Sequence, residues 1–180
     1  MTLFIIGYMA SGKTTFGRAL ARQTGLQHID LDFYIEQRFH STVREIFAQK
    51  GEAEFRRIES AMLREVGEMS DVVISCGGGT PCNGDNMEYM NTRGITVCLQ
   101  ASDDVIAERI LQAGNKRPLM AGKSKEEILQ TLREHMEVRK PFYDRASVII
   151  SGDKLENKRQ ISETVEDFIK NHFHNLEKKE

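Results

Sequence analysis

Residues 3–15 read LFIIGYMASGKTT, and this segment decides the fold. An apolar run leads into a loop that fits the pattern G-x-x-x-x-G-K-[ST], with Gly7, Gly12, Lys13 and Thr14 at the defining positions. Glycines in such a loop let backbone N–H groups point at phosphate oxygens, and the N-terminus of the following helix adds partial positive charge. The lysine reaches the outer phosphates and the hydroxyl coordinates Mg²⁺. Because a strand pattern precedes the loop and a helix pattern follows it, we interpret the segment as a nucleoside triphosphate site, not as a chance match.

The rest of the chain alternates short apolar runs with helical patterns. Strands are predicted at 3–7, 26–30, 71–76, 95–100 and 146–150. Helices are predicted at 13–24, 42–50, 52–68, 102–113, 125–140 and 156–174. This alternation predicts a single α/β domain, residues 1–180, with a parallel sheet that helices cover on both faces. The segment GNKRPLMAGKS at 114–124 has no periodicity and is interpreted as a surface loop.

The composition excludes several classes of protein. A net charge of −2 over 180 residues provides no basic field for nucleic acid or an anionic membrane. The apolar start is too short to span a bilayer. Cys76, Cys82 and Cys98 are an odd number of cysteines without C-x-x-C spacing, which argues against a disulfide framework and a zinc site. We therefore expect a cytoplasmic protein and, since no long apolar helix face indicates an obligate dimer, a monomer.

A nucleotide-dependent switch is one alternative to an enzyme. A GTPase would recognise guanine through an N-K-x-D motif, but the segment NKRP at 115–118 has Pro118 where the aspartate must stand. The segment also lies in the loop and not at the end of a strand. We therefore reject the switch.

The acidic residues are not where a phosphate-loop protein usually has them. Such proteins place an aspartate at the end of a second buried strand to hold Mg²⁺, yet the strand at 71–76 ends in Ser75 and Cys76. Asp30 and Asp32 follow the preceding strand instead, and residues two apart in an extended segment point the same way. Both carboxylates are therefore expected in the cleft beyond the strand ends, one for the metal and one for a substrate hydroxyl. For either residue the alternative is an N-cap of the following helix.

Arg56 is expected to reach the cleft from the helix at 52–68. Phe55 belongs to the core face of this helix, and Arg56 lies about 100° from it on the helical wheel. Arg57 lies about 200° away and is interpreted as a surface charge.

Arg139 is expected to reach the same cleft from the helix at 125–140. It lies about 20° from Ile128 on the wheel, within the apolar face. A guanidinium on an inward face must find an anion. The alternative is a cap of the helix C-terminus, which Pro141 ends just beyond. His135 lies on the same face and is interpreted as a core histidine, not a catalyst.

The sequence resembles the shikimate kinases over most of its length. The matching segments are GYMASGKTT at 7–15, DLD at 30–32, FRRIE at 55–59, GGG at 77–79, RPL at 117–119 and RKPFY at 139–143. The resemblance implies a P-loop kinase of the nucleoside-monophosphate-kinase type, with a five-stranded parallel sheet flanked by helices. It implies a lid at about 112–124 and substrate-binding helices at about 32–60. It also implies transfer of the ATP γ-phosphoryl group to the 3-hydroxyl of shikimate in aromatic biosynthesis.

The resemblance implies a role for each matched residue. Asp30 and Thr14 would hold Mg²⁺, and Lys13, Asp32 and Arg117 would be catalytic. The residues implied in ATP binding are Ala10, Ser11, Gly12, Lys13, Thr14, Thr15 and the lid residue Arg117. The residues implied in shikimate binding are Asp32, Arg56, Gly77, Gly78, Gly79 and Arg139.

Some segments depart from the family pattern. Ala10 stands where the family often carries glycine, and alanine is expected to be tolerated there if φ is negative. The lid reads RPLM where a second leucine is usual. The segment SGDKLE at 151–156 matches no motif, and Arg109 is only a candidate neighbour of the adenine.

The glycines at 77–79 are interpreted as the floor of the substrate pocket. Bare backbone lets a compact ring approach closely, with N–H groups available to its carboxylate or hydroxyls. A plain tight turn, the alternative, would usually need one glycine. Two rival functions remain at this point: a kinase of the same fold for gluconate or a nucleoside monophosphate, and a protein that binds nucleotide without catalysis. A protein that only binds nucleotide would need no second pocket for an anionic substrate.

Overall fold

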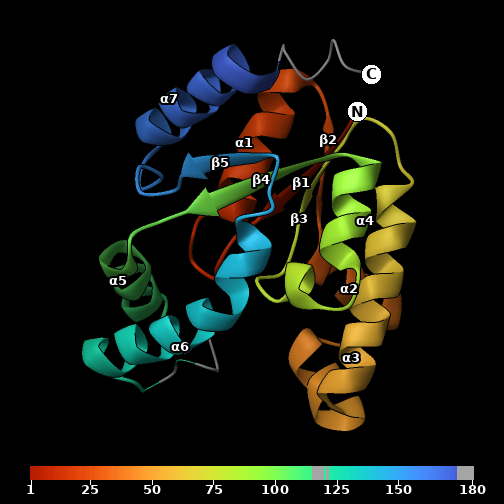
Figure 1. Cartoon of the computed structure of the whole chain (residues 1–180), viewed down its shortest axis with the longest axis vertical. Helices are drawn as coiled ribbons and strands as arrows, with labels where there is room; N and C mark the ends of the chain where they lie inside the picture. Colours follow the sequence, from red (N-terminus) through yellow and green to blue (C-terminus); the bar gives the residue numbers. More distant parts are fainter. Residues whose placement is uncertain (115–119, 121, 174–180) are drawn as a thin grey trace.

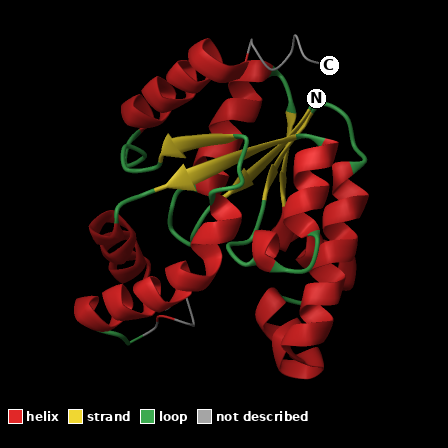
Figure 2. Ribbon diagram, in the orientation of Figure 1, coloured by secondary structure: helices red, strands yellow, loops and turns green. Residues whose placement is uncertain are grey.

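The computed structural model describes residues 1–114, 120 and 122–173, and contains the expected five-stranded sheet (Figures 1 and 2). The strand order is β2-β3-β1-β4-β5, and every neighbouring pair is parallel. The strands are β1 (Thr2–Ile6), β2 (Gln27–Asp30), β3 (Val72–Ser75), β4 (Ile95–Gln100) and β5 (Val148–Ser151). The predicted α/β class and all five strands are confirmed, with boundaries that differ by at most two residues.

Helices cover both faces of the sheet. They are α1 (Lys13–Thr24), α2 (Leu31–Phe39), α3 (Val43–Gly67), α4 (Asn86–Arg93), α5 (Asp103–Ala113), α6 (Lys125–Tyr143) and α7 (Lys158–Phe168). Alternation along β1 divides the core: Leu3 and Ile5 pack toward α1 and α7, whereas Phe4 and Ile6 pack toward α3 and α4. Figure 1 shows α5 and α6 on one side of the molecule and α2 and α3 on the other. None of the helices in the described ranges is long and apolar enough to cross a membrane.

The structure corrects several predicted helices. α4 was not predicted, and α2 was expected only from the resemblance, within the substrate-binding helices at about 32–60. Both are short, and α2 begins directly where β2 ends. The helices expected at 42–50 and 52–68 form one element with a kink at Gly51, whose φ of 78° and ψ of 170° are not helical. α6 continues through Pro141 to Tyr143, although a proline at that position cannot donate to the carbonyl four residues earlier. The last predicted helix is α7 followed by a π-helical turn, Ile169–Phe173.

Candidate active site

A cavity of about 400 Å³ lies beyond the carboxyl ends of β1, β2 and β3. Open parallel sheets bind ligands at this edge. The residues that line it are Met9, Ala10, Gly12, Lys13, Thr14, Thr15, Asp30, Asp32, Ser75, Cys76, Gly77, Gly78, Arg109, Leu155 and Glu156. The cavity therefore joins the phosphate loop, both aspartates and the start of the triple-glycine turn in one space.

The phosphate loop has the backbone expected of an anion-binding turn. Gly12 is the N-cap of α1 with φ of 99°, and Gly7 has φ of 136°. Residues that carry a Cβ rarely adopt these backbone angles. The Lys13 ammonium donates to the Tyr8 carbonyl oxygen at 2.8 Å and so lies over the loop. The condition for tolerating alanine at position 10 is not met: the φ of Ala10 is 63°, in the left-handed region where glycine is preferred.

Thr14 and Asp30 lie together at the bottom of the cavity. The Thr14 hydroxyl donates to Asp30 Oδ2 at 2.8 Å, and Asp30 Oδ1 accepts from the Phe33 N–H at 3.3 Å. Asp30 is thus also the N-cap of α2. The described residues contain no cluster of three or more metal-binding side chains. Mg²⁺ usually takes only one or two protein oxygens beside phosphates and water, so a hydroxyl and a carboxylate at a phosphate loop suit it.

Asp32 faces the same cavity from a different conformation than expected. It lies in the first turn of α2, so the extended segment assumed from the sequence ends at Asp30. Burial, helped by the nearby charges of Glu59 and Asp30, raises the pKa of Asp32 to about 6. A carboxylate with a pKa near neutrality is suited to accept a proton.

Arg56 reaches the cavity region from α3 and is already paired. Its Nη1 donates at 2.8 Å to Glu59 Oε2, and the Glu59 side chain is only 1% exposed. Its guanidinium also lies 5.5 Å from the Phe55 ring centre. Arg57, by contrast, is 77% exposed and pairs with Glu54 on the helix surface, as expected for a solvated charge.

Arg139 packs on an aromatic ring, and none of the ion pairs among the described residues joins it to a carboxylate. Its guanidinium carbon lies 5.3 Å from the centre of the Tyr8 ring, a cation–π geometry. The Tyr8 hydroxyl in turn contacts His135 Nδ1 at 2.7 Å, so His135 has a partner as predicted. Burial, followed by the charges of Arg139 and Lys123, lowers the pKa of His135. Since α6 continues past Arg139, this residue is not a C-terminal cap.

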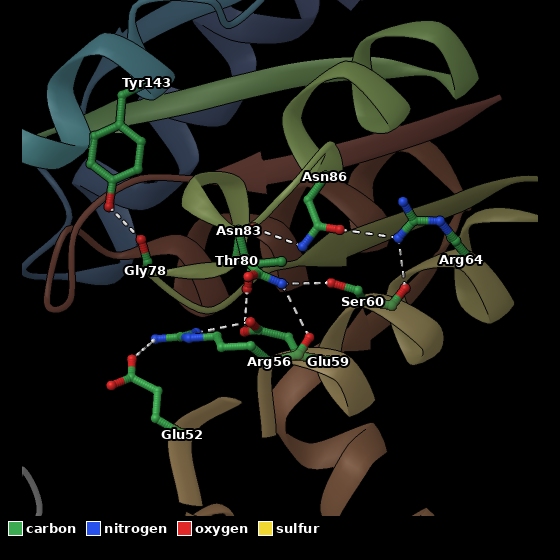
Figure 3. Close-up of polar contacts among 10 residues, drawn as sticks. All are labelled: Glu52, Arg56, Glu59, Ser60, Arg64, Gly78, Thr80, Asn83, Asn86 and Tyr143. Atoms are coloured by element: carbon green, nitrogen blue, oxygen red, sulfur yellow. Dashed lines mark hydrogen bonds and ion pairs between the residues drawn. The ribbon is translucent and has the colours of Figure 1, made fainter. Parts of the chain in front are cut away.

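Each glycine of the turn at 77–79 lies against one of these charged side chains. A Cβ on Gly77 would lie 3.2 Å from Asp32 Oδ1, one on Gly78 3.3 Å from Arg139 Nη1, and one on Gly79 2.6 Å from Arg56 Nη2. The Tyr143 hydroxyl donates to the Gly78 carbonyl oxygen at 2.6 Å, which fixes the turn to α6 (Figure 3). The turn therefore brings together three side chains from α2, α3 and α6.

Comparison with known proteins agrees with this arrangement. The family model for shikimate kinase matches residues 9–170. The chain belongs to the shikimate kinase family. A shikimate kinase of Bacteroides fragilis is 50% identical over 168 residues, which cover 93% of this chain and 94% of that protein.

Solved shikimate kinases share the fold. The crystal structure of the enzyme from Bacteroides thetaiotaomicron has a TM-score of 0.91 at 46% identity, covering 94% of this chain and 97% of that one. The enzyme from Acinetobacter baumannii, solved in complex with shikimate, has a TM-score of 0.83 at 29% identity, covering 97% of this chain and 93% of that one. The predicted kinase fold is thereby confirmed.

The structure of this shikimate kinase family member adds residues that the sequence did not single out. Glu59 was within a matched motif, and its burial beside Arg56 was not visible in the pattern. Leu155 and Glu156, from the segment without a motif, line the cavity. Arg109 joins them: it pairs with Glu156 and donates to the Ala10 carbonyl oxygen at 3.1 Å. Arg117 and the middle of the expected lid, residues 115–119 and 121, lie outside the described residues.

Proposed function

We propose that this chain transfers the γ-phosphoryl group of ATP to the 3-hydroxyl of shikimate. The hydroxyl oxygen forms a bond to the γ-phosphorus, the bond to the β–γ bridging oxygen breaks, and ADP leaves. The observation that supports it best is the placement of a carboxylate and two arginines around one glycine turn, next to a phosphate loop. This pattern suits a small acid that carries hydroxyl groups.

Asp32 is the proposed acceptor for the substrate hydroxyls. It orients the attacking oxygen and takes its proton, which its raised pKa permits. The demand on such a base is modest, because phosphoryl transfer passes through a loose transition state. Positioning by Asp32 and the glycine turn is therefore proposed as its larger contribution.

Arg56 and Arg139 are the proposed anchors for the substrate carboxylate. A planar guanidinium forms two parallel hydrogen bonds with a carboxylate, a geometry that lysine lacks. Both side chains lie against the turn formed by Gly78 and Gly79. The turn leaves room between them because it carries no side chains.

ATP is proposed to bind along the phosphate loop, residues 10–15, with Lys13 and the lid residue Arg117 on the transferring phosphoryl group. Mg²⁺ is proposed to be held by Thr14 and, through water, by Asp30. When bound it supplies positive charge that offsets charge on the phosphate oxygens. The three cysteines are free, two of them buried, which supports the proposal that the protein works in a reducing cytoplasm. We further propose that it acts as a monomer.

One assay tests the substrate assignment. ADP release is followed with shikimate, gluconate and AMP offered in turn, and turnover is expected with shikimate alone. Arg139→Lys is the matched variant: it keeps the charge, loses the planar fork, and is expected to raise KM for shikimate about tenfold or more. Turnover with gluconate at a similar kcat/KM would contradict the proposal. An unchanged KM in Arg139→Lys would remove this arginine from the substrate site.

A further inference from the structure

A buried hydroxyl completes the ion pair behind Arg56 (Figure 3). Glu59 is 1% exposed, and a carboxylate so buried needs donors for both of its oxygens. Oε2 accepts from Arg56 Nη1 at 2.8 Å, and Oε1 accepts from the Thr80 hydroxyl at 2.6 Å. One oxygen is thus bound by a cation and the other by a neutral side chain.

This division determines how much of the Arg56 guanidinium stays available. A guanidinium and a carboxylate ordinarily pair through two parallel hydrogen bonds. Here the second carboxylate oxygen is already bonded to Thr80, so Glu59 takes one amino group of the arginine. The other amino group, Nη2, makes a long 3.5 Å contact with Glu52, which is 72% exposed. The guanidinium lies beside Gly79, and Nη2 is the nearest of its atoms to the position that a Cβ on that glycine would take.

We propose that Thr80 is a positioning residue for acid binding: its hydroxyl holds Glu59 on one amino group of Arg56 and leaves the other for the substrate. Without that hydroxyl, Glu59 Oε1 would need another donor, and the second amino group of the same arginine could supply it through the two-bond pairing that guanidinium and carboxylate ordinarily form. The inference rests on the proposed role of Arg56 as a carboxylate anchor.

Thr80 is itself fixed from behind, as a positioning residue must be. It is fully buried, and its carbonyl oxygen accepts from the side-chain amide of Asn86 at 2.9 Å. Asn86 is also fully buried, and its Oδ1 accepts from Arg64 Nη1 at 3.0 Å. Asn83 donates to the Arg56 carbonyl oxygen at 3.2 Å, which joins the same turn to α3 (Figure 3). The hydroxyl therefore has little freedom to turn away from Glu59.

Two substitutions separate the hydroxyl from packing. Thr80→Val keeps the shape and removes the hydroxyl, and is expected to raise KM for shikimate about tenfold. KM for ATP and the Kd for ADP are expected to stay within twofold. Thr80→Ser keeps the hydroxyl and loses a methyl group, and is expected to retain a KM for shikimate within twofold of the parent. If Thr80→Val does not fold, Thr80→Ala lacks the same hydroxyl and carries the same expectation.

Two further variants control the test. Glu52→Gln changes the exposed partner of the same arginine and is expected to leave KM for shikimate within twofold. Arg56→Lys tests the anchor itself and is expected to raise that KM about tenfold or more. A raised KM in Arg56→Lys together with an unchanged KM in the variants that lack the hydroxyl overturns the role of Thr80 alone. Equal increases in Thr80→Val and Thr80→Ser overturn it in favour of packing. An unchanged KM in Arg56→Lys removes the proposed anchor and the inference with it.

Discussion

The phosphate loop and the triple-glycine turn follow neighbouring strands, β1 and β3, and need glycine for different reasons. Gly7 and Gly12 have φ of 136° and 99°, so the first loop needs glycine for its backbone angles, and Leu99 and Leu155 in addition leave no space there for a Cβ. The glycines at 77–79 keep φ outside the left-handed region. They lie instead where a Cβ would press on Thr80, Arg139 or Arg56. The first loop binds its ligand with its own backbone, and the second makes space for side chains that come from elsewhere.

Gly7→Ala is expected to have the largest effect. The new Cβ would meet a strained φ and would overlap the carbonyl oxygen of Leu99, a backbone atom that cannot swing aside. We expect a loss of about 3 kcal/mol or more in the free energy of unfolding and a weakening of ADP binding by about 100-fold. Urea denaturation and calorimetric titration measure the two effects. A stable variant with normal ADP affinity would show that the loop does not need glycine for the φ at position 7.

Asp32→Asn tests the side chain that Gly77 accommodates. The amide cannot accept the proton of the attacking hydroxyl, so kcat is expected to fall about 100-fold or more. ADP affinity is expected to change little, because the phosphate loop is intact. In the parent enzyme, kcat/KM is expected to fall as the pH drops below about 6, where Asp32 becomes protonated. A near-normal kcat in the variant would exclude Asp32 as the base, because the amide oxygen can still orient the hydroxyl but cannot take its proton.

The same substitution is expected to stabilise the protein without ligands. The pKa of Asp32 is raised from 3.8 to about 6, so its ionisation opposes folding at neutral pH. The folded protein favours the protonated carboxyl of Asp32, so the contribution of this group to the free energy of unfolding is fully present below about pH 4 and is lost as the pH rises through 6. Asp32→Asn should therefore exceed the parent by roughly 1–3 kcal/mol at pH 7.5, with the gap closing between pH 6 and pH 4. A gap that is constant with pH would exclude ionisation as its cause.

Alanine in the second loop is expected to impair acid binding and spare the nucleotide. In Gly79→Ala the Cβ would displace the end of the Arg56 side chain, which is flexible, so the fold should survive. KM for shikimate is expected to rise about tenfold. Gly78→Ala, whose Cβ would lie 3.3 Å from Arg139 Nη1, is expected to have a smaller effect of the same kind. Titration with each ligand decides: a loss confined to ADP affinity would reverse the assigned roles of the two loops.

The contrast also explains what the sequence could predict. The phosphate loop is local, so its motif predicted the strand, the turn and the helix that the structure contains. Helical periodicity likewise distinguished the inward-facing Arg56 from the exposed Arg57, because the spacing of apolar residues along a helix shows which face is buried.

Contacts between distant segments could not be predicted in this way. The sequence does not show that Thr80 meets Glu59, or that Tyr8 lies under Arg139, since each pair joins elements far apart in the chain. The helical position of Asp32 was missed, because α2 begins without a connecting loop, and the N-cap that was weighed only as an alternative is Asp30. A motif thus identifies the local anion site, whereas the role of the second loop depends on side chains that only tertiary packing brings to it.

Ala10→Gly is expected to have the smallest effect, and it tests the first loop in the opposite direction. Ala10 adopts φ of 63°, which costs a residue with a Cβ about 1–2 kcal/mol. Glycine removes that strain, while its greater freedom in the unfolded chain takes back about 0.5–1 kcal/mol. A net gain of roughly 0.5 kcal/mol is therefore expected in urea denaturation, with KM for ATP within twofold. If backbone φ limits the first loop and space for side chains limits the second, Ala10→Gly stabilises the protein while Gly78→Ala weakens shikimate binding. A destabilised Ala10→Gly would show that contacts of the Ala10 methyl group outweigh its backbone strain.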